Sequence, residues 1–291
     1  MSDPRRLPVI LDTDIGDDVD DAYALALVAS APNADLLGVT TASGETPRRA
    51  ALAAKFLQTM GRREVPVHAG RVTNGQIGRQ AEWAAGFRAR ALKAEPAVEF
   101  LRRAIERRPG EVTLVAVGPL PNIADLIARY PETAKKLRRI VIMGGAVRHG
   151  YRIDSPPEPE WNIRSDVSAA QTVFSAGIPL VMAGLEATAM LQLDPERQKR
   201  LFAYGAPATD ALAALTALWG NGVPTLYDPM AVAWALEARY CQSESRRVVV
   251  DESGLTKAAD GAPTVELLTH PQKEAFLDWY VLSVGAWTRK P

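Results

Sequence analysis

Six aspartates, the residues most able to do chemistry in this chain, fall within ten positions at the end of its first apolar run: Asp12, Asp14, Asp17, Asp18, Asp20 and Asp21. Carboxylates this close repel one another, and each loses hydration when it is held beside a packed sheet. A bound divalent cation is the simplest way to offset that cost. The donors are all oxygen, and no Cys or His lies nearby in sequence, so Ca²⁺ or Mg²⁺ is favoured over Zn²⁺.

Helix capping is the alternative use for part of this cluster. Asp20 and Asp21 stand at the start of a predicted helix, whose N-terminus favours negative charge. Capping employs one or two side chains and leaves the other four aspartates unexplained. Asp12 and Asp14 are two apart in an extended segment, so they project to the same side of it. The whole cluster therefore predicts a metal site.

Short apolar runs alternate with longer segments of helical spacing, which predicts an α/β fold with a Rossmann-like, mostly parallel central sheet flanked by helices. We expect one domain over residues 1–291. The predicted strands are residues 9–13, 36–41, 65–69, 112–117, 140–143 and 180–183, with less regular strands near 248 and 265. The predicted helices are residues 20–30, 47–60, 96–107, 122–130 and 167–176. A helical insertion follows at about residue 190, with a long stretch over 194–219, a helix from 228 and a closing helix over 273–287.

Ligands of an open α/β sheet bind beyond the carboxyl ends of the strands, where loops from several strands meet. The aspartate cluster follows the first strand. The other loops expected at this edge are residues 43–45, 117–119, 144–145 and 154–164. We expect these segments to form one site.

Two known metal motifs can be compared with the cluster. An EF-hand calcium loop does not fit, because Gly16 is misplaced and no Glu closes a twelve-residue loop. A magnesium-dependent phosphatase of the haloacid dehalogenase type is the better rival, with Asp12 as nucleophile and Asp14 as acid and base. That family usually has Thr or Val where this chain has Gly16.

The segment Asp-x-Asp-x-Gly, followed by Asp20-Asp21-Ala22-Tyr23-Ala24-Leu25, resembles the signature of the inosine-uridine-type nucleoside hydrolases. Further segments occur in the order of that family. They are Leu37-Gly38-Val39-Thr40-Thr41, Val115-Ala116-Val117-Gly118-Pro119, Val141-Ile142-Met143-Gly144-Gly145, Glu160-Trp161-Asn162 and Asp228-Pro229. The similarity runs from about residue 8 to about residue 236.

This resemblance implies calcium-dependent cleavage of a nucleoside or other N-riboside into free base and ribose. It implies a Ca²⁺ site formed by Asp14, Asp21, Asp228 and the carbonyl oxygen of Val117, with Asp12 in support. Asp14 would orient and deprotonate the attacking water, and the ribose hydroxyls would contact Asp20, Glu160 and Asn162. A cluster of carboxylates suits the positive charge that develops on the ribosyl group. Direct attack by water predicts inversion at the anomeric carbon.

The chain departs from the family pattern at its first motif. Ile15 replaces the usual Pro, and two extra residues precede Asp20. We align Asp20 and Asp21 with the family's pair because the following Ala22 matches. If Asp17 and Asp18 were the pair instead, the metal and ribose contacts would move to them.

Other departures concern the substrate. Glu45 and Asp154 stand where members of the family carry Asn, and both are predicted substrate contacts. Tyr227 occupies the position of a His thought to protonate the leaving base, and its usual pKa near 10 makes it a weaker acid. This replacement leaves open a protein that binds a nucleoside without cleaving it. Trp83 and Trp219 are candidates for contacting the base, although most tryptophans belong to the core.

The balance of charge limits the partners. The chain has 34 basic and 34 acidic residues, so no overall field draws it to nucleic acid or to an anionic membrane. No signal-peptide-like or membrane-spanning stretch is evident, and the single Cys241 forms no internal disulfide, which predicts a cytoplasmic protein. The family resemblance implies self-association into a homodimer or homotetramer.

Overall fold

The computed structural model describes residues 6–287. Its strands are β1 (Leu7–Thr13), β2 (Ala34–Thr41), β3 (Val67–Ala69), β4 (Leu92–Lys93), β5 (Thr113–Ala116), β6 (Arg139–Met143), β7 (Leu180–Ala183), β8 (Gln242–Arg246), β9 (Val248–Val250), β10 (Thr256–Ala258) and β11 (Val265–Thr269). Within this range nine strands form one sheet in the order β4-β3-β2-β1-β5-β6-β7-β11-β8. Only β8 among them runs antiparallel to its neighbour, and β9 pairs with β10 as a separate antiparallel ribbon. The predicted mostly parallel sheet is confirmed.

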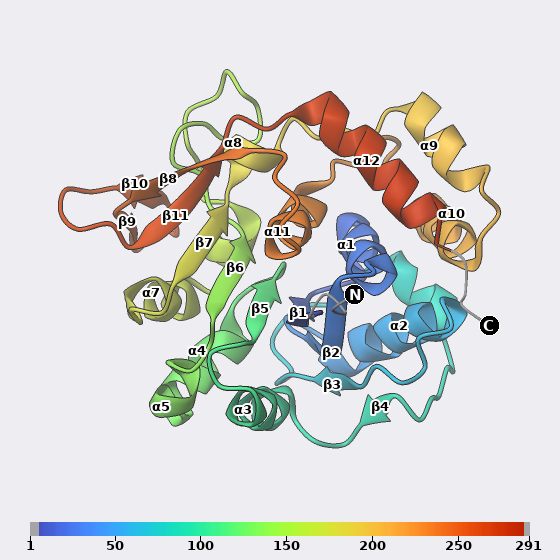
Figure 1. Cartoon of the computed structure of the whole chain (residues 1–291), viewed down its shortest axis with the longest axis horizontal. Coiled ribbons are helices and arrows are strands. Elements are labelled where there is room, and N and C mark those ends of the chain that lie inside the picture. The colour runs from blue at the N-terminus through green and yellow to red at the C-terminus, as the bar shows by residue number, and fades with distance from the viewer. Residues whose placement is uncertain (1–5, 288–291) are drawn as a thin grey trace, which may run out of the picture.

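Helices cover both faces of this sheet (Figure 1). The helices are α1 (Asp20–Ser30), α2 (Thr46–Thr59), the 3-10 helix η1 (Arg79–Ala84), α3 (Ala97–Arg107), α4 (Pro121–Arg129), α5 (Pro131–Ala134), α6 (Trp161–Ser165), α7 (Val167–Ser175), α8 (Leu185–Thr188), α9 (Pro195–Phe202), α10 (Pro207–Trp219), α11 (Tyr227–Ala235) and α12 (Lys273–Gly285). Helices α1, α2, α10, α11 and α12 belong to one apolar core. Helices α3, α4 and α7 belong to the other.

The alternation of side chains along the strands creates these two cores. In β1, Val9 and Leu11 enter the core beneath α1, whereas Ile10 enters the core beneath α3 and α4. In β5, Val115 faces the first core and Leu114 the second. Strands buried on both faces read as continuous apolar runs, which is why these central strands are recognisable in the sequence.

The segment from α8 to α11 is helical, as the sequence predicts, but it contains more separate helices than expected. The predicted helix over residues 194–219 is two helices, α9 and α10, because Gly205 has a φ of +58° and Pro207 begins the second helix. Strands β4 and β8 are not predicted by any pattern in the sequence. β4 has two residues, and β8 is a polar edge strand of sequence Gln-Ser-Glu-Ser-Arg.

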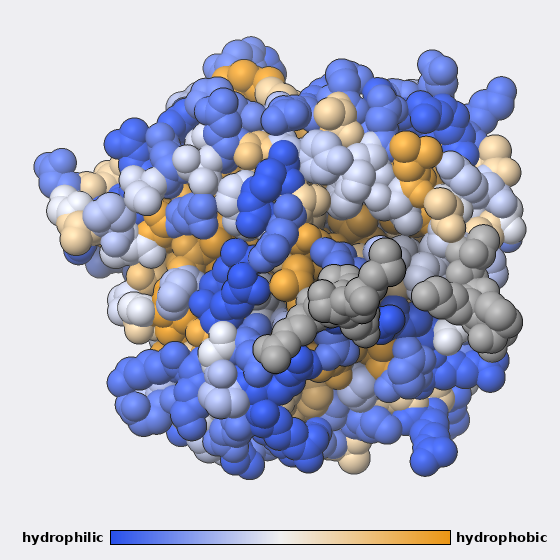
Figure 2. Space-filling view, viewed as in Figure 1, coloured by the Kyte–Doolittle hydropathy of each residue, from blue (hydrophilic) through white to orange (hydrophobic). Residues whose placement is uncertain are grey.

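The surface on the side seen in Figure 1 is mainly hydrophilic, and hydrophobic residues show chiefly in recesses between the elements (Figure 2). Across residues 6–287, none of the helices combines the length and apolar character needed to cross a bilayer.

Candidate active site

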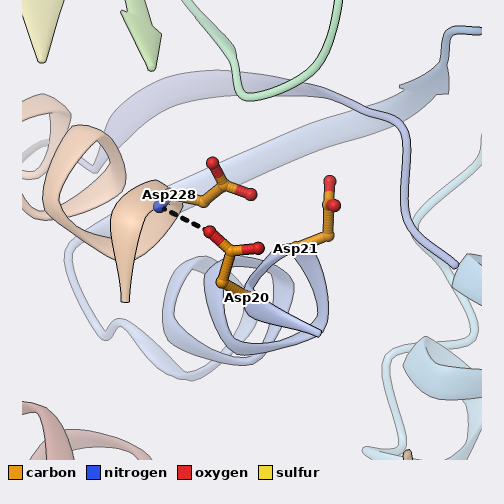
Figure 3. A group of neighbouring side chains, drawn as sticks. All are labelled: Asp20, Asp21 and Asp228. Carbon is orange, nitrogen blue, oxygen red and sulfur yellow. Dashed lines mark hydrogen bonds between the residues drawn. The ribbon is translucent and has the colours of Figure 1, made fainter. Parts of the chain in front are cut away.

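Three carboxylates that are distant in sequence meet between two helix N-termini. Asp20 and Asp21 lie in the first turn of α1, and Asp228 lies in the first turn of α11. Their side chains point toward one another (Figure 3), and one carboxylate oxygen from each lies within 4.8 Å of the others. The structure thus brings Asp21 and Asp228 together, as the sequence predicts, with Asp20 beside them.

Hydrogen bonds hold two of these carboxylates. Asp20 Oδ2 accepts from the backbone N–H of Asp228 at 3.2 Å, and Asp21 Oδ1 accepts from the hydroxyl of Thr13. The N-cap of α1, Val19, makes no side-chain capping hydrogen bond. Asp20 therefore contributes to the N-terminus of α11 rather than capping its own helix, so the capping alternative explains one contact and not the cluster.

Asp14 directly follows β1 and lines the same cavity as these three carboxylates. Its side chain is buried, and a Cβ added to Gly118 would lie 2.5 Å from Asp14 Oδ1. The absence of a side chain at position 118 therefore lets the loop after β5 approach the Asp14 carboxylate. Val117, whose carbonyl is a predicted metal ligand, precedes that glycine.

These groups line a cavity of about 300 Å³. Its lining residues are Asp14, Asp17, Asp18, Asp20, Asp21, Val117, Met143, Tyr151, Glu160, Trp161, Asn162, Arg164, Tyr227 and Asp228. Most of the polar lining is carboxylate, and three aromatic side chains, those of Tyr151, Trp161 and Tyr227, also line the cavity. The cavity therefore combines a strongly anionic region with surfaces that suit a planar ring.

Burial raises the pKa values of Asp14, Asp20, Asp21 and Asp228. For Asp14 the pKa rises to about 7, mainly through burial, although nearby Arg49 lowers it. Burial and the neighbouring carboxylates hold the pKa values of Asp20, Asp21 and Asp228 well above their usual range. Without a cation these groups would tend to hold protons, so a divalent ion would relieve the repulsion. The donors are oxygens, and no His or Cys lines the cavity within the described chain, so the residues fit Ca²⁺.

Glu160 and Asn162 form a rigid, buried edge of the cavity. Glu160 caps α6 and accepts from the backbone N–H groups of Asn162, Ile163 and Gly145 at 2.9, 3.2 and 3.0 Å. Asn162 Nδ2 donates to the carbonyl oxygens of Val117 at 3.0 Å and Met143 at 3.1 Å. Their spacing in sequence could equally have described a solvated loop, but both side chains are buried.

The pair at 17 and 18 has different surroundings from the pair at 20 and 21. Asp17 forms an ion pair with Arg49 at 2.6 Å, and Asp18 is exposed and accepts from the backbone N–H of Val19 at 2.6 Å. Both line the cavity, but the carboxylates that converge with Asp228 are those of Asp20 and Asp21. The geometry favours the alignment that places the two extra residues before Asp20.

Four residues expected at the site do not line the cavity. Glu45 pairs with Arg48 at 2.8 Å, and Asp154 pairs with Arg152 at 2.9 Å on an exposed loop. Trp83 packs on Phe56 and beneath the Lys55 ammonium, while Trp219 ends α10 against the core. Glu45, Asp154 and Trp83 each contact a partner that directs the side chain elsewhere, whereas Trp219 packs against the apolar core.

Sequence reasoning named Tyr227 as a substrate contact but missed four lining residues, Met143, Tyr151, Trp161 and Arg164. Tyr151 and Tyr227 meet edge to face with ring centroids 6.2 Å apart, and burial raises the pKa of Tyr227 to about 12. Trp161 is 51% exposed and carries the Arg164 guanidinium 5.0 Å from its ring centroid. The position of Trp161 between Glu160 and Asn162 was a usable signal, whereas nothing in the sequence singled out Tyr151.

Asp12 lies behind the cavity and not in its wall. It has no exposed surface, and its Oδ1 accepts from the Thr40 hydroxyl and from Asn122 Nδ2, the latter at 2.7 Å. Burial raises its pKa to about 7. A side chain enclosed in this way cannot attack a bound phosphate ester, which removes the basis for Asp12 as a phosphatase nucleophile.

Comparison with known proteins shows which family and fold this chain shares. The family model for inosine-uridine preferring nucleoside hydrolases matches residues 9–278. The pyrimidine-specific ribonucleoside hydrolases of Citrobacter koseri and Escherichia coli are each 34% identical over 271 residues, covering 85% of both chains. Among solved structures, a plant nucleoside hydrolase superposes with a TM-score of 0.87 at 24% identity, over 98% of this chain and 100% of that one. A purine-preferring ribonucleoside hydrolase from Gardnerella vaginalis gives 0.85 at 24% identity, over 96% and 98%.

Fold and relatives together define a hydrolase that acts on N-glycosyl bonds. The chain belongs to the inosine-uridine preferring nucleoside hydrolase family, as the sequence motifs predict.

Proposed function

We propose that this protein is a calcium-dependent N-ribohydrolase that cleaves the N-glycosidic bond of a purine or pyrimidine ribonucleoside, or a related N-riboside, into free base and ribose. The observation that carries the proposal is the meeting of the Asp20, Asp21 and Asp228 carboxylates in a cavity that Asp14 also lines. Protons can offset the cost of bringing such carboxylates together, and in an active site a cation or a developing positive charge offsets it.

Asp14, Asp21, Asp228 and the carbonyl oxygen of Val117 would hold the ion. Bound there, Ca²⁺ would offset the charge of the cluster and lower the pKa of water beside it. The Val117 carbonyl already accepts one hydrogen bond, from Asn162, and its second lone pair leaves it able to accept another contact.

Asp14 would act as the base that takes a proton from the attacking water. Asp14 directly follows the buried strand β1 and lines the cavity, where a general base must be placed. As the bond to the base breaks, positive charge develops on the ribosyl group, and the carboxylates lining the cavity stabilise that charge. A single attack by water gives inversion at the anomeric carbon.

Asp20, Glu160 and Asn162 would bind the ribose hydroxyls. All three are buried and line the cavity. Glu160 has three backbone donors and Asn162 two carbonyl acceptors, so both are held in place before a substrate arrives. Such preorganisation reduces the cost of orienting the sugar.

The leaving base would lie against the aromatic wall formed by Tyr151, Trp161 and Tyr227. Tyr227 precedes Asp228 directly and lines the cavity. Its neutral hydroxyl can donate a hydrogen bond to the departing base. The relatives at 34% identity are named pyrimidine-specific, so pyrimidine nucleosides are the first substrates to test.

A reducing-sugar assay over a broad panel of ribosides, with calcium or with a chelator, tests the proposal. We expect ribose from at least one nucleoside and a strong decrease on chelation. Asp14→Ala should abolish turnover while the circular dichroism spectrum stays that of the parent. Tight nucleoside binding without cleavage over long incubation would instead favour a non-catalytic binding protein.

Cytoplasmic location and assembly as a homodimer or homotetramer stay predictions. Light scattering coupled to size exclusion measures the mass of the assembly, and one copy of the chain has a mass of 31.5 kDa. A mass of a single copy at micromolar concentration would contradict the expected assembly.

A further inference from the structure

Arg49 of α2 is an arginine buried in the structure next to the acidic cluster. Its side chain is 1% exposed, and among the described residues Arg49 has the largest volume of the fully buried side chains. An arginine loses much hydration on burial, so its placement needs a set of acceptors that compensates for it. Those acceptors all belong to the two turns that follow β1 and β2.

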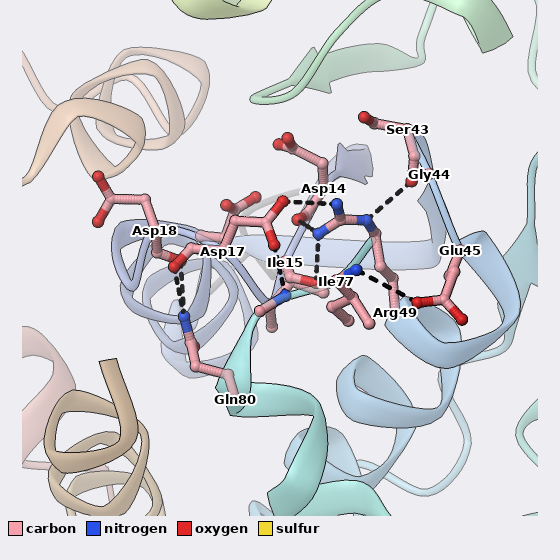
Figure 4. A network of polar contacts seen from close by, with 12 residues as sticks. Asp14, Ile15, Asp17, Asp18, Ser43, Gly44, Glu45, Arg49, Ile77 and Gln80 are labelled. Carbon is pink, nitrogen blue, oxygen red and sulfur yellow. Dashed lines mark hydrogen bonds and ion pairs between the residues drawn. The ribbon is translucent and has the colours of Figure 1, made fainter. Parts of the chain in front are cut away.

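The guanidinium joins these turns by hydrogen bonds (Figure 4). Nη1 donates to the backbone carbonyls of Asp14 and Ile15, the latter at 3.2 Å. Nε donates to the carbonyl of Ser43 at 2.8 Å. Nη2 forms the ion pair with Asp17 Oδ2 at 2.6 Å. Arg49 thus contacts the backbone of the proposed base itself.

Asp17 links the same turn to a third segment. Its Oδ1 accepts from the backbone N–H of Gly78 at 2.6 Å. Gln80 Nε2 donates to the carbonyl oxygens of Asp17 at 3.2 Å and Asp18 at 3.0 Å. We name Arg49, Asp17 and Gln80 the clasp.

The turn held by the clasp is one that local sequence alone would not maintain. Gly16 has a φ of +130°, and a Cβ there would lie 2.5 Å from the Ile77 side chain. Ser43, whose carbonyl Arg49 binds, has a φ of +67°, which is uncommon for a residue with a side chain. These conformations persist because the surrounding contacts impose them.

From these contacts we propose that Arg49, through the clasp, is a positioning residue that holds the backbone of Asp14 so that its carboxylate faces the metal and the attacking water. This inference rests on the proposed function. The clasp involves the residues between Asp14 and Asp20, the same short stretch in which this chain carries two extra residues.

The charge of Arg49 makes a positioning role separable from an electrostatic one. A cation close to the cluster repels Ca²⁺, so removing that charge should by Coulomb's law strengthen calcium binding. Loss of positioning has the opposite effect, because a displaced Asp14 weakens the site. The sign of the change in affinity decides between the two.

The experiment measures calcium affinity by titration calorimetry, together with kcat and KM, for Arg49→Met and Arg49→Lys. Arg62→Met and Arg62→Lys are the matched controls, because Arg62 also donates to a backbone carbonyl, of Ala29, and to a carboxylate, of Glu64, outside the cavity. We expect both Arg49 variants to bind calcium at least about tenfold more weakly and to lose about 10²-fold in kcat at saturating calcium, since a misplacement of about 1 Å has that effect. The Arg62 variants should match the parent in both.

Parent-like or tighter calcium binding with parent-like kcat in the folded Arg49 variants would overturn the proposal. If both variants fail to fold, Gln80→Met provides the test, because it loosens the clasp without changing charge or touching Asp14. A several-fold loss of kcat would then support the proposal, and parent values would overturn it. Failure of the proposed function is distinct, since it appears as no ribose release by the parent from any riboside, while the calcium titrations still rank the variants.

Discussion

Asp20 Oδ2 accepts a hydrogen bond from the backbone N–H of Asp228 at 3.2 Å, although the two residues are 208 positions apart in sequence. This contact joins the N-terminus of α1 to that of α11 and brings the carboxylates of Asp21 and Asp228 close together. Both helix N-termini carry partial positive charge, which reduces the electrostatic cost of bringing these carboxylates together. The proposed metal site is thus built from two helices that are distant in sequence.

Asp21→Asn should remove one proposed calcium ligand and leave the packing nearly unchanged. We expect weaker calcium binding and a decrease of about 10³-fold in kcat/KM, because the stabilisation by the ion is several kcal/mol. Steady-state kinetics and calcium titration measure both. Asp154→Asn is the control, since Asp154 is an exposed aspartate outside the cavity, and it should behave as the parent. Equal effects in the two variants would contradict the assignment.

Calcium should stabilise the folded protein, because a ligand bound only to the native state shifts the unfolding equilibrium. At 100 times the dissociation constant the gain is about 2.7 kcal/mol, which corresponds to roughly 4–5 °C in Tm for a chain of this size. Thermal denaturation with calcium and with a chelator measures the shift. Asp228→Asn should abolish it, and a shift of unchanged size in that variant would place the ion elsewhere.

Trp161→Ala should raise KM about fivefold for nucleosides with little change in kcat, since stacking on an aromatic side chain contributes about 1 kcal/mol. Trp83→Ala and Trp219→Ala should leave KM near the parent value, because neither side chain lines the cavity. The comparison of KM across the three variants tests the revised placement of the base. A larger effect at Trp83 than at Trp161 would return the base to the position expected from sequence.

Tyr227→Phe removes one hydroxyl from the cavity wall. If that hydroxyl donates to the departing base, kcat for a nucleoside should fall about tenfold, the usual effect of one hydrogen bond. The rate for 4-nitrophenyl riboside should change little, because its leaving group departs as a stable anion. An equal loss for both substrates would show that Tyr227 affects the sugar rather than the base.

Asp12→Ala should act mainly on stability. It leaves the Thr40 hydroxyl and the Asn122 amide without their buried acceptor, which costs about 2–3 kcal/mol of unfolding free energy. Urea denaturation followed by circular dichroism measures this loss. Residual ribose release by the folded variant would agree with a supporting role, whereas a phosphoaspartyl intermediate in the parent would contradict the enclosure of Asp12.

Sequence reasoning succeeded where a local pattern of residue types has a clear physical meaning. The central strands β1, β5, β6 and β7 are apolar on both faces, so the sequence predicts them, and the crowded aspartates locate the acidic cavity. It failed where a side-chain contact decides the outcome, whether the partner is near in sequence or distant from it. Glu45 and Asp154 turn to neighbouring arginines, and Trp83 turns to Phe56 and Lys55. The Arg49 contact with Asp14 spans 35 residues and has no local signature.

The most direct test of the calcium site is the anomalous difference map of a crystal grown with calcium. The account predicts one ion with ligand distances of about 2.3–2.6 Å to Asp14, Asp21, Asp228 and the carbonyl oxygen of Val117. An ion bound away from these residues, or an empty cavity in a protein that releases ribose in the presence of chelator, would contradict it.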